Sequence, residues 1–198
     1  MATPADALRQ VLATLDRMEI AYSIGGSVAS SEHGFPRTTM DVDLVVDLKP
    51  EQIDEFAALL HNSFYADAEL IRESFSHHRA ANVIHYETGY KFDLFPLGKD
   101  DYSRIEFQRR SLREIQAIPT GVIECQLATA EDTILRKLEW YRRGEETSER
   151  QWNDLRGIVK VNHARLDLAY LRQWAPHLRV ADLLEKLLGE RTSLNKEY

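Results

Sequence analysis

Helical and strand-like patterns of apolar residues alternate over the first two thirds of the chain. Apolar residues recur every three or four positions over residues 4–18 and 50–61, which predicts two amphipathic helices. Thr3 and Pro4 suit the N-cap and the first position of the first helix. Short apolar runs between turn residues predict strands at 21–24, 42–46, 82–86, 90–95, 114–118 and 122–127, with turns at 87–89 and 119–121.

Only helical spacing is found in the last third of the chain. Thr129 precedes two acidic residues, which is typical of a helix N-terminus, and Gly144 is a typical helix end. Further helices are predicted at 148–161, 166–174 and 180–188. We therefore expect an α+β fold in which residues 1–127 form a mixed β-sheet flanked by helices and residues 128–198 form a C-terminal helical subdomain.

The composition is that of a globular protein and excludes several classes. Of the 198 residues, 43% are hydrophobic and 29% are charged, which excludes disordered and collagen-like chains. The net charge of −7 argues against a broad nucleic-acid-binding face. No apolar run is long enough for a membrane span or a signal peptide, so we expect a cytoplasmic protein without membrane contact. The single cysteine, Cys125, excludes an internal disulfide and a cysteine-based zinc site.

Two glycines and a serine follow the first predicted strand. Gly25 and Gly26 allow the backbone to approach phosphate oxygens closely, because neither residue carries a Cβ atom. Ser27 opens a predicted helix and adds a hydroxyl and backbone N–H groups at the positive end of the helix dipole. This turn is therefore a candidate phosphate-binding site.

Two aspartates begin the next predicted strand, and a third lies further along the chain. Asp41 and Asp43 project from the same face, because side chains alternate along a strand. Their mutual repulsion is relieved by a divalent cation with oxygen ligands, such as Mg²⁺ or Mn²⁺. Asp93 lies within an apolar strand, where an acid without a partner is costly, so we expect it to complete the site. Each aspartate alone also suits a purely structural strand start, but three together with the glycine turn favour a site.

This pattern resembles the signature of the DNA polymerase β-like nucleotidyltransferase superfamily, which has a glycine turn, an Asp-x-Asp pair and a later aspartate. The matching residues are Gly25, Gly26, Ser27, Asp41, Asp43 and Asp93. The segment Arg37-Thr-Thr-Met-Asp-Val-Asp43 resembles a form found in stand-alone bacterial nucleotidyltransferases and in abortive-infection toxins. Lys137 and Asp154 resemble more loosely the helical lysine and Arg-Asp motif of those toxins, although Asn153 stands where the motif has arginine.

The resemblance implies a nucleotidyltransferase-like sheet and transfer of a nucleoside monophosphate from an NTP, for example ATP, to an acceptor hydroxyl, with pyrophosphate leaving. Asp41, Asp43 and Asp93 would hold Mg²⁺ or Mn²⁺, and Asp93 would also activate the acceptor. The other implied nucleotide contacts are Gly25, Gly26, Ser27, Arg37 and Lys137. The acceptor would be tRNA, a protein or a small molecule such as an aminoglycoside, and the toxin branch would add an antitoxin partner.

Simpler interpretations stay open for three of the polar residues. Arg37 also suits a loop arginine paired with a surface acid. Lys137 also suits a side chain that covers apolar surface and reaches solvent. Asp154 would either orient Lys137 or Arg150, or lie exposed on its helix.

Two other functions are alternatives to nucleotidyl transfer for the same residues. A haloacid-dehalogenase-like phosphatase would use Asp41 and Asp43, but its motif follows a buried apolar strand, and the glycine turn would have no role. A non-catalytic NTP-binding or toxin–antitoxin partner protein with the same fold remains the alternative. Such a protein differs from a nucleotidyltransferase in that it releases no pyrophosphate from an NTP when an acceptor is supplied.

Overall fold

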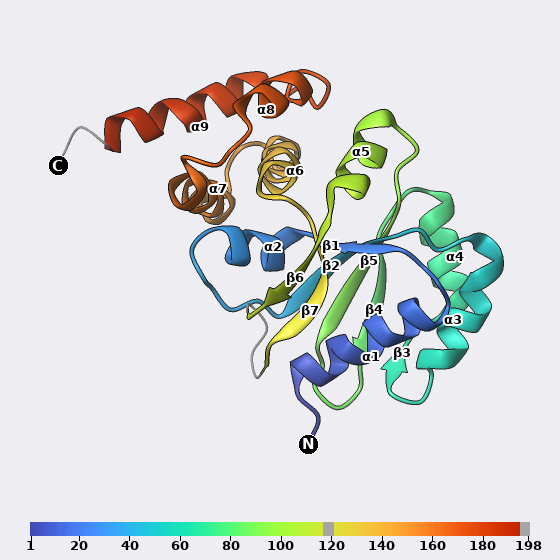
Figure 1. Ribbon diagram of the computed structural model, residues 1–198. Helices are drawn as coiled ribbons and strands as arrows, with labels where there is room; N and C mark the ends of the chain where they lie inside the picture. Colours follow the sequence, from blue (N-terminus) through green and yellow to red (C-terminus); the bar gives the residue numbers. More distant parts are fainter. Residues whose placement is uncertain (117–120, 195–198) are drawn as a thin grey trace. The chain divides into compact units, whose positions relative to one another are not determined.

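The structure is a computed structural model that describes residues 1–116 and 121–194, with side chains up to residue 190. Its contacts group the chain into two compact units (Figure 1). The first, which we call the sheet unit, comprises Met1–Val28 and Thr38–Ala128. The second, the helical unit, comprises Ala29–Arg37 and the chain from Thr129 onward. The domain boundary after residue 127 stays a prediction, and the grouping of Ala29–Arg37 with the C-terminal helices was not anticipated.

The described part of the sheet unit contains a seven-stranded mixed sheet with the order β3-β4-β5-β2-β1-β7-β6. The pairs β2·β5 and β1·β7 are parallel, and the other neighbours are antiparallel. The mixed α+β sheet expected from the sequence is therefore confirmed. The strands are β1 (Tyr22–Ile24), β2 (Asp41–Val46), β3 (Phe64–Tyr65), β4 (Ala81–His85), β5 (Lys91–Pro96), β6 (Ser111–Ile115) and β7 (Ile123–Leu127).

The helices of the sheet unit are α1 (Pro4–Arg17), the short 3-10 helix η1 (Pro50–Gln52), α3 (Ile53–Leu60), α4 (Ala68–Ser76) and α5 (Asp101–Arg109). Helix α1 begins as predicted, since Thr3 and Asp6 form a reciprocal capping box and Pro4 occupies the first turn. It contacts α3 and β7, α3 contacts α4, and α4 contacts β4, so these helices lie together beside the sheet (Figure 1). The buried faces of α1 and α3 form much of the apolar core.

Three elements of the sheet unit were not predicted. Helix α4 buries only Ile71 among its apolar residues, and α5 has a weakly apolar sequence capped by Asp100. Strand β3 has two residues, which is too short for an alternating pattern.

Strand β6 begins at Ser111, three residues earlier than expected, because its middle is exposed. The turn predicted at 119–121 lies largely outside the described residues.

The helical unit contains the predicted C-terminal helices. These are α6 (Ala130–Arg143), α7 (Glu149–Asn162), α8 (Leu168–Trp174) and α9 (Ala181–Leu194), the last extending beyond the predicted end at residue 188. Helix α6 contacts α7, α8 and α9, and the apolar faces of all four are buried against one another. Helix α2 (Gly26–His33) begins in the sheet unit, and its second half is assigned to the helical unit. Among the described helices, none combines the length and the apolar composition that a membrane crossing requires.

Candidate functional site

Four charged side chains share one face of the sheet where β2 runs parallel to β5. In this register Asp41 lies beside Lys91, and Asp43 lies beside Asp93. The residues that alternate with them, such as Val42 and Phe92, are fully buried on the opposite face. Because neighbouring strands are about 4.8 Å apart, the three predicted acids are brought to one small, partly exposed area of the sheet.

The Asp41 carboxylate is oriented by a buried threonine. The Thr39 hydroxyl donates a hydrogen bond to Asp41 Oδ1 over 2.8 Å, and Thr39 is only 2% exposed. The Tyr90 hydroxyl donates to the Thr39 carbonyl over 2.9 Å. Burial, with a smaller effect from the charge of Asp41, raises the pKa of Tyr90 to about 12. Thr39 was not among the predicted site residues, although it lies in the segment Arg37-Thr-Thr-Met-Asp-Val-Asp43.

Both carboxylate oxygens of Asp93 have partners. The Asn82 side-chain amide donates a hydrogen bond to Oδ1, and the Lys91 ammonium lies 2.8 Å from Oδ2. The hydrogen bond to Asp93 raises the pKa of Lys91 against a lowering by burial, and the charges of Asp93, Asp41 and Asp43 raise it further. Lys91 therefore interacts with all three carboxylates. Neither Asn82 nor Lys91 was identified from the sequence; the position of Lys91 two residues before Asp93 was the available signal.

The glycine turn approaches Asp43 closely. A Cβ atom on Gly26 would lie 1.7 Å from Asp43 Oδ2, and Gly26 has a φ of +52°, so both space and backbone conformation require glycine. The Gly25 N–H donates to the Asp43 carbonyl over 2.9 Å, and the Ser27 N–H lies 3.4 Å from Asp43 Oδ2. The N-terminus of α2 therefore lies against the carboxylate of the Asp-x-Asp pair. This adjacency is the one expected for a turn that binds phosphates next to a metal.

The face of the sheet that carries Asp41, Asp43 and Asp93 offers the type of ligand atoms that a divalent cation binds. Three carboxylates supply the hard oxygen ligands that Mg²⁺ and Mn²⁺ take, and the Lys91 ammonium already acts as a cation among them. Within residues 1–116 and 121–194, no group of three acidic, histidine or cysteine side chains is close enough to form a ready-made metal site. The present partners of these carboxylates include Lys91 and Asn82 at Asp93 and Thr39 at Asp41.

A second charged cluster lies within the helical unit and centres on Asp154. Arg37 binds this carboxylate through two atoms, with Nε 2.9 Å from Oδ1 and Nη2 3.0 Å from Oδ2. The Lys137 ammonium lies 2.8 Å from Oδ2. The Asp154 and Lys137 side chains are only 9% and 10% exposed. Burial would raise the pKa of Asp154, but the hydrogen bonds and charges of Arg37 and Lys137 outweigh it and lower the pKa below 3.8.

This cluster decides between the interpretations left open by the sequence. Lys137 does not reach solvent, and Asp154 is not an exposed helix acid. Arg37 does pair with an acid, but that acid is a buried one far along the chain. Asp154 therefore orients Lys137, as one alternative proposed, and Arg37 as well. The sequence did not predict that Asp154 pairs with both Arg37 and Lys137.

Close backbone packing seats Arg37 beside Asp154. A Cβ atom on Gly34 would lie 2.8 Å from the backbone nitrogen of Ile158, and one on Gly157 would lie 3.1 Å from the backbone nitrogen of Phe35. The loop after α2 therefore packs closely on α7. This contact explains why Ala29–Arg37 groups with the C-terminal helices.

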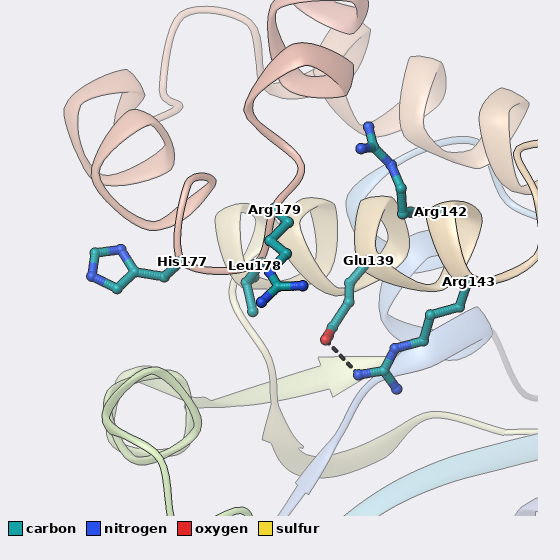
Figure 2. Close-up of a pocket in the computed structure, with 6 residues that line it drawn as sticks. All are labelled: Glu139, Arg142, Arg143, His177, Leu178 and Arg179. Carbon is teal, nitrogen blue, oxygen red and sulfur yellow. Dashed lines mark hydrogen bonds and ion pairs between the residues drawn. The ribbon is translucent and has the colours of Figure 1, made fainter.

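A cavity of about 490 Å³ in the helical unit contains none of the predicted site residues (Figure 2). It is lined by Glu139, Arg142, Arg143, His177, Leu178 and Arg179. Figure 2 shows Arg143 bound to Glu139, and the distance between them is 2.6 Å. Arg142 pairs instead with Asp182 over 2.7 Å. Much of the positive charge around this cavity is therefore already neutralised.

Comparison with known proteins places the fold. No family model and no curated protein sequence matches the chain. Among solved structures, an antigenic nucleotidyltransferase-like protein from Paracoccidioides brasiliensis is 19% identical, with a TM-score of 0.55 over 96% of this chain and 89% of that one. The chain has the nucleotidyltransferase fold. This confirms the superfamily resemblance at the level of fold, while the toxin subtype stays a prediction.

Two further structures with the nucleotidyltransferase fold are those of ANT(2'')-Ia. Its complex with adenylyl-2''-tobramycin is 14% identical, with a TM-score of 0.53 over 87% of this chain and 95% of that one. A solution structure of the same antibiotic-resistance factor is 13% identical, with a TM-score of 0.50 over 95% of both chains. At these identities the likeness shows a common fold only. The activity of this chain has to be argued from its own residues.

Proposed function

We propose that the protein is a metal-dependent nucleotidyltransferase that moves a nucleoside monophosphate from an NTP to an acceptor hydroxyl. The observation that carries this proposal is the placement of Asp41, Asp43 and Asp93 on one face of the sheet, with the Gly26 turn directly against Asp43. A purely structural role for these residues does not require three carboxylates side by side. The shared fold supports the same conclusion.

The chemistry assigns different roles to these residues. Asp41, Asp43 and Asp93 would hold the divalent cation, which would neutralise the triphosphate and promote in-line attack at the α-phosphorus. Thr39 and Asn82 keep Asp41 and Asp93 oriented for this task. The N-terminus of α2, which already directs the Ser27 N–H toward Asp43 Oδ2, would bind phosphate oxygens through backbone N–H groups. Asp93 would accept the proton of the acceptor hydroxyl once Oδ2 is released by Lys91.

Arg37 and Lys137 are the proposed cationic contacts of the nucleotide phosphates. Both side chains pair with the carboxylate of Asp154. Ion pairing with Asp154 holds both side chains in defined positions, which lowers the entropy cost of binding a phosphate. Asp154 is thus a proposed positioning residue.

The acceptor would be a small molecule, tRNA or a protein. The likeness to ANT(2'')-Ia, whose complex contains adenylyl-2''-tobramycin, makes aminoglycosides the first compounds to test. An antitoxin partner is expected only if the protein belongs to the toxin branch. A non-catalytic NTP-binding protein remains the alternative function.

The deciding experiment measures pyrophosphate release. The protein is incubated with each NTP, Mg²⁺ or Mn²⁺, and an aminoglycoside, tRNA or protein acceptor. We expect release with one NTP, and loss of at least a hundredfold in Asp43→Asn and Asp93→Asn, because each removes a metal ligand. The matched control is Asp54→Asn, whose carboxylate is 75% exposed in the same unit and should leave the rate unchanged.

Thermal unfolding with each NTP separates catalysis from binding. An NTP at a hundred times its Kd adds about 2.7 kcal/mol to the free energy of unfolding. Metal-dependent stabilisation that is lost in Asp41→Ala, together with no pyrophosphate from any acceptor, would favour the non-catalytic alternative. No stabilisation by any NTP with either metal would contradict both functions.

A further inference from the structure

Lys91 occupies the position among the carboxylates that an incoming cation needs. Its ammonium binds Asp93 Oδ2, while Asn82 holds Oδ1, so no oxygen of Asp93 lacks a polar partner. The Lys91 side chain is 40% exposed, whereas that of Asp93 is 14% exposed. The ammonium therefore lies on the solvent side of the pair, and it can leave Asp93 by rotation of side-chain bonds without any change in β5.

The charges on this face explain why a lysine is needed there. Asp41, Asp43 and Asp93 would place three negative charges on two adjacent strands, and Lys91 reduces their sum to −2. Carboxylates so close repel one another, which favours protonation or displacement of one of them. An ammonium beside Asp93 and opposite Asp41 in the register opposes this repulsion.

We propose that Lys91 is a resident counter-ion that holds the three carboxylates in place before a divalent cation binds, and that the cation must displace it from Asp93. The proposal rests on the proposed function and deepens it by naming a residue that controls entry of the metal. A displaced ammonium needs a new anionic partner, and the phosphates of an NTP supply one. Metal and nucleotide therefore bind more tightly together than separately.

The experiment measures binding of Mn²⁺ alone, without nucleotide, by titration calorimetry and by the electron paramagnetic resonance of free Mn²⁺. Lys91→Met removes the competing charge and should tighten Mn²⁺ binding about tenfold, as expected for one charge at roughly 5 Å in a partly hydrated site. Lys91→Gln keeps a hydrogen-bond donor for Asp93 without the charge and should tighten binding similarly, so it tests the charge if the first variant folds poorly.

The matched control is Lys49→Met. Lys49 also pairs with an aspartate two residues away, with 2.6 Å between Nζ and Asp47 Oδ1, and it lies in the same unit outside the site. Its substitution should leave Mn²⁺ affinity unchanged. Without Lys91 the three carboxylates repel one another, so the Lys91 variants should melt at a lower temperature than the wild type in EDTA. Adding Mn²⁺ should raise their melting temperature again.

Three outcomes would overturn the inference. Mn²⁺ affinity that is unchanged or weaker in both Lys91 variants shows that the lysine does not compete with the cation. The same result with weaker NTP binding identifies Lys91 as a phosphate contact instead. If neither the wild type nor the variants bind Mn²⁺, and adding an NTP does not restore binding, the metal-dependent function itself fails. Binding by the wild type with no gain in the variants removes only the role of Lys91.

Discussion

The carboxylate of Asp154 pairs with two cations of the helical unit, Arg37 and Lys137. Both its own side chain and that of Lys137 are about nine-tenths buried. A buried ion pair adds little net stability compared with an apolar replacement, because desolvation offsets the attraction. Removal of one partner is a different case, since the remaining charges stay buried and lose the attraction of that partner.

Asp154→Asn should therefore lower the free energy of unfolding by about 3 kcal/mol, the usual cost of breaking a buried pair. Urea denaturation followed by circular dichroism measures this. Asp182→Asn is the control, because Asp182 also pairs with an arginine but is 71% exposed, and its loss should cost less than about 1 kcal/mol. Equal effects of the two substitutions would show that Asp154 is not buried as the structure indicates.

At the scale of elements, the junction between β1 and α2 determines the geometry of the candidate site. The Gly25 N–H binds the backbone of β2, and the positive φ of Gly26 directs the chain into the helix. These two features bring the helix N-terminus against Asp43. The turn, rather than either element alone, therefore determines the geometry of the proposed phosphate site.

Gly26→Ala should destabilise the protein by about 2 kcal/mol, because a left-handed backbone conformation and a clash with Asp43 act together. Gly25→Ala is the matched control, since a Cβ there meets nothing within 4 Å. Melting temperatures of the two variants test the difference. A Gly26→Ala protein as stable as Gly25→Ala would mean that the turn has another conformation.

At the scale of the whole molecule, several ion pairs make the stability depend on pH in one direction. Five carboxylates have pKa values below their ordinary range because hydrogen bonds, chiefly from arginine, lysine and threonine side chains, favour the charged form; they are Asp6, Asp154, Asp182, Glu185 and Glu190. A carboxyl group with a lower pKa in the folded state binds protons first in the unfolded state. Its stabilising effect is present above the unfolded pKa and is lost as the pH falls through the folded pKa.

The free energy of unfolding should therefore fall as the pH drops below about 4. The difference between wild type and Asp154→Asn should shrink over the same range, since protonation removes the charge that the substitution also removes. Urea denaturation at pH 7, 5 and 3 measures both quantities. A difference that stays constant or grows down to pH 3 would contradict the ion-pair account, because a lowered pKa in the folded state means that the unfolded state binds the proton of Asp154 first.

The sequence by itself determined much of the local structure. Capping residues and apolar spacing were sufficient for α1, α6 and α7, because these helices bury a regular stripe and begin at clear N-caps. The alternation of side chains along a strand was enough to place Asp41 and Asp43 on one face. Helix α4 was not predicted, because its nine residues are a short stretch in which to recognise a helical repeat.

Only the tertiary structure decided which distant residues meet. The parallel register of β2 and β5 places Asp93 beside Asp43 and Lys91 beside Asp41, and strand pairing is a property of two segments rather than one. The engagement of Asp154 by Arg37 likewise depends on a loop that packs on α7 more than a hundred residues away in the chain. Local patterns specify the direction of a side chain within its own element, but its partners depend on how the elements pack.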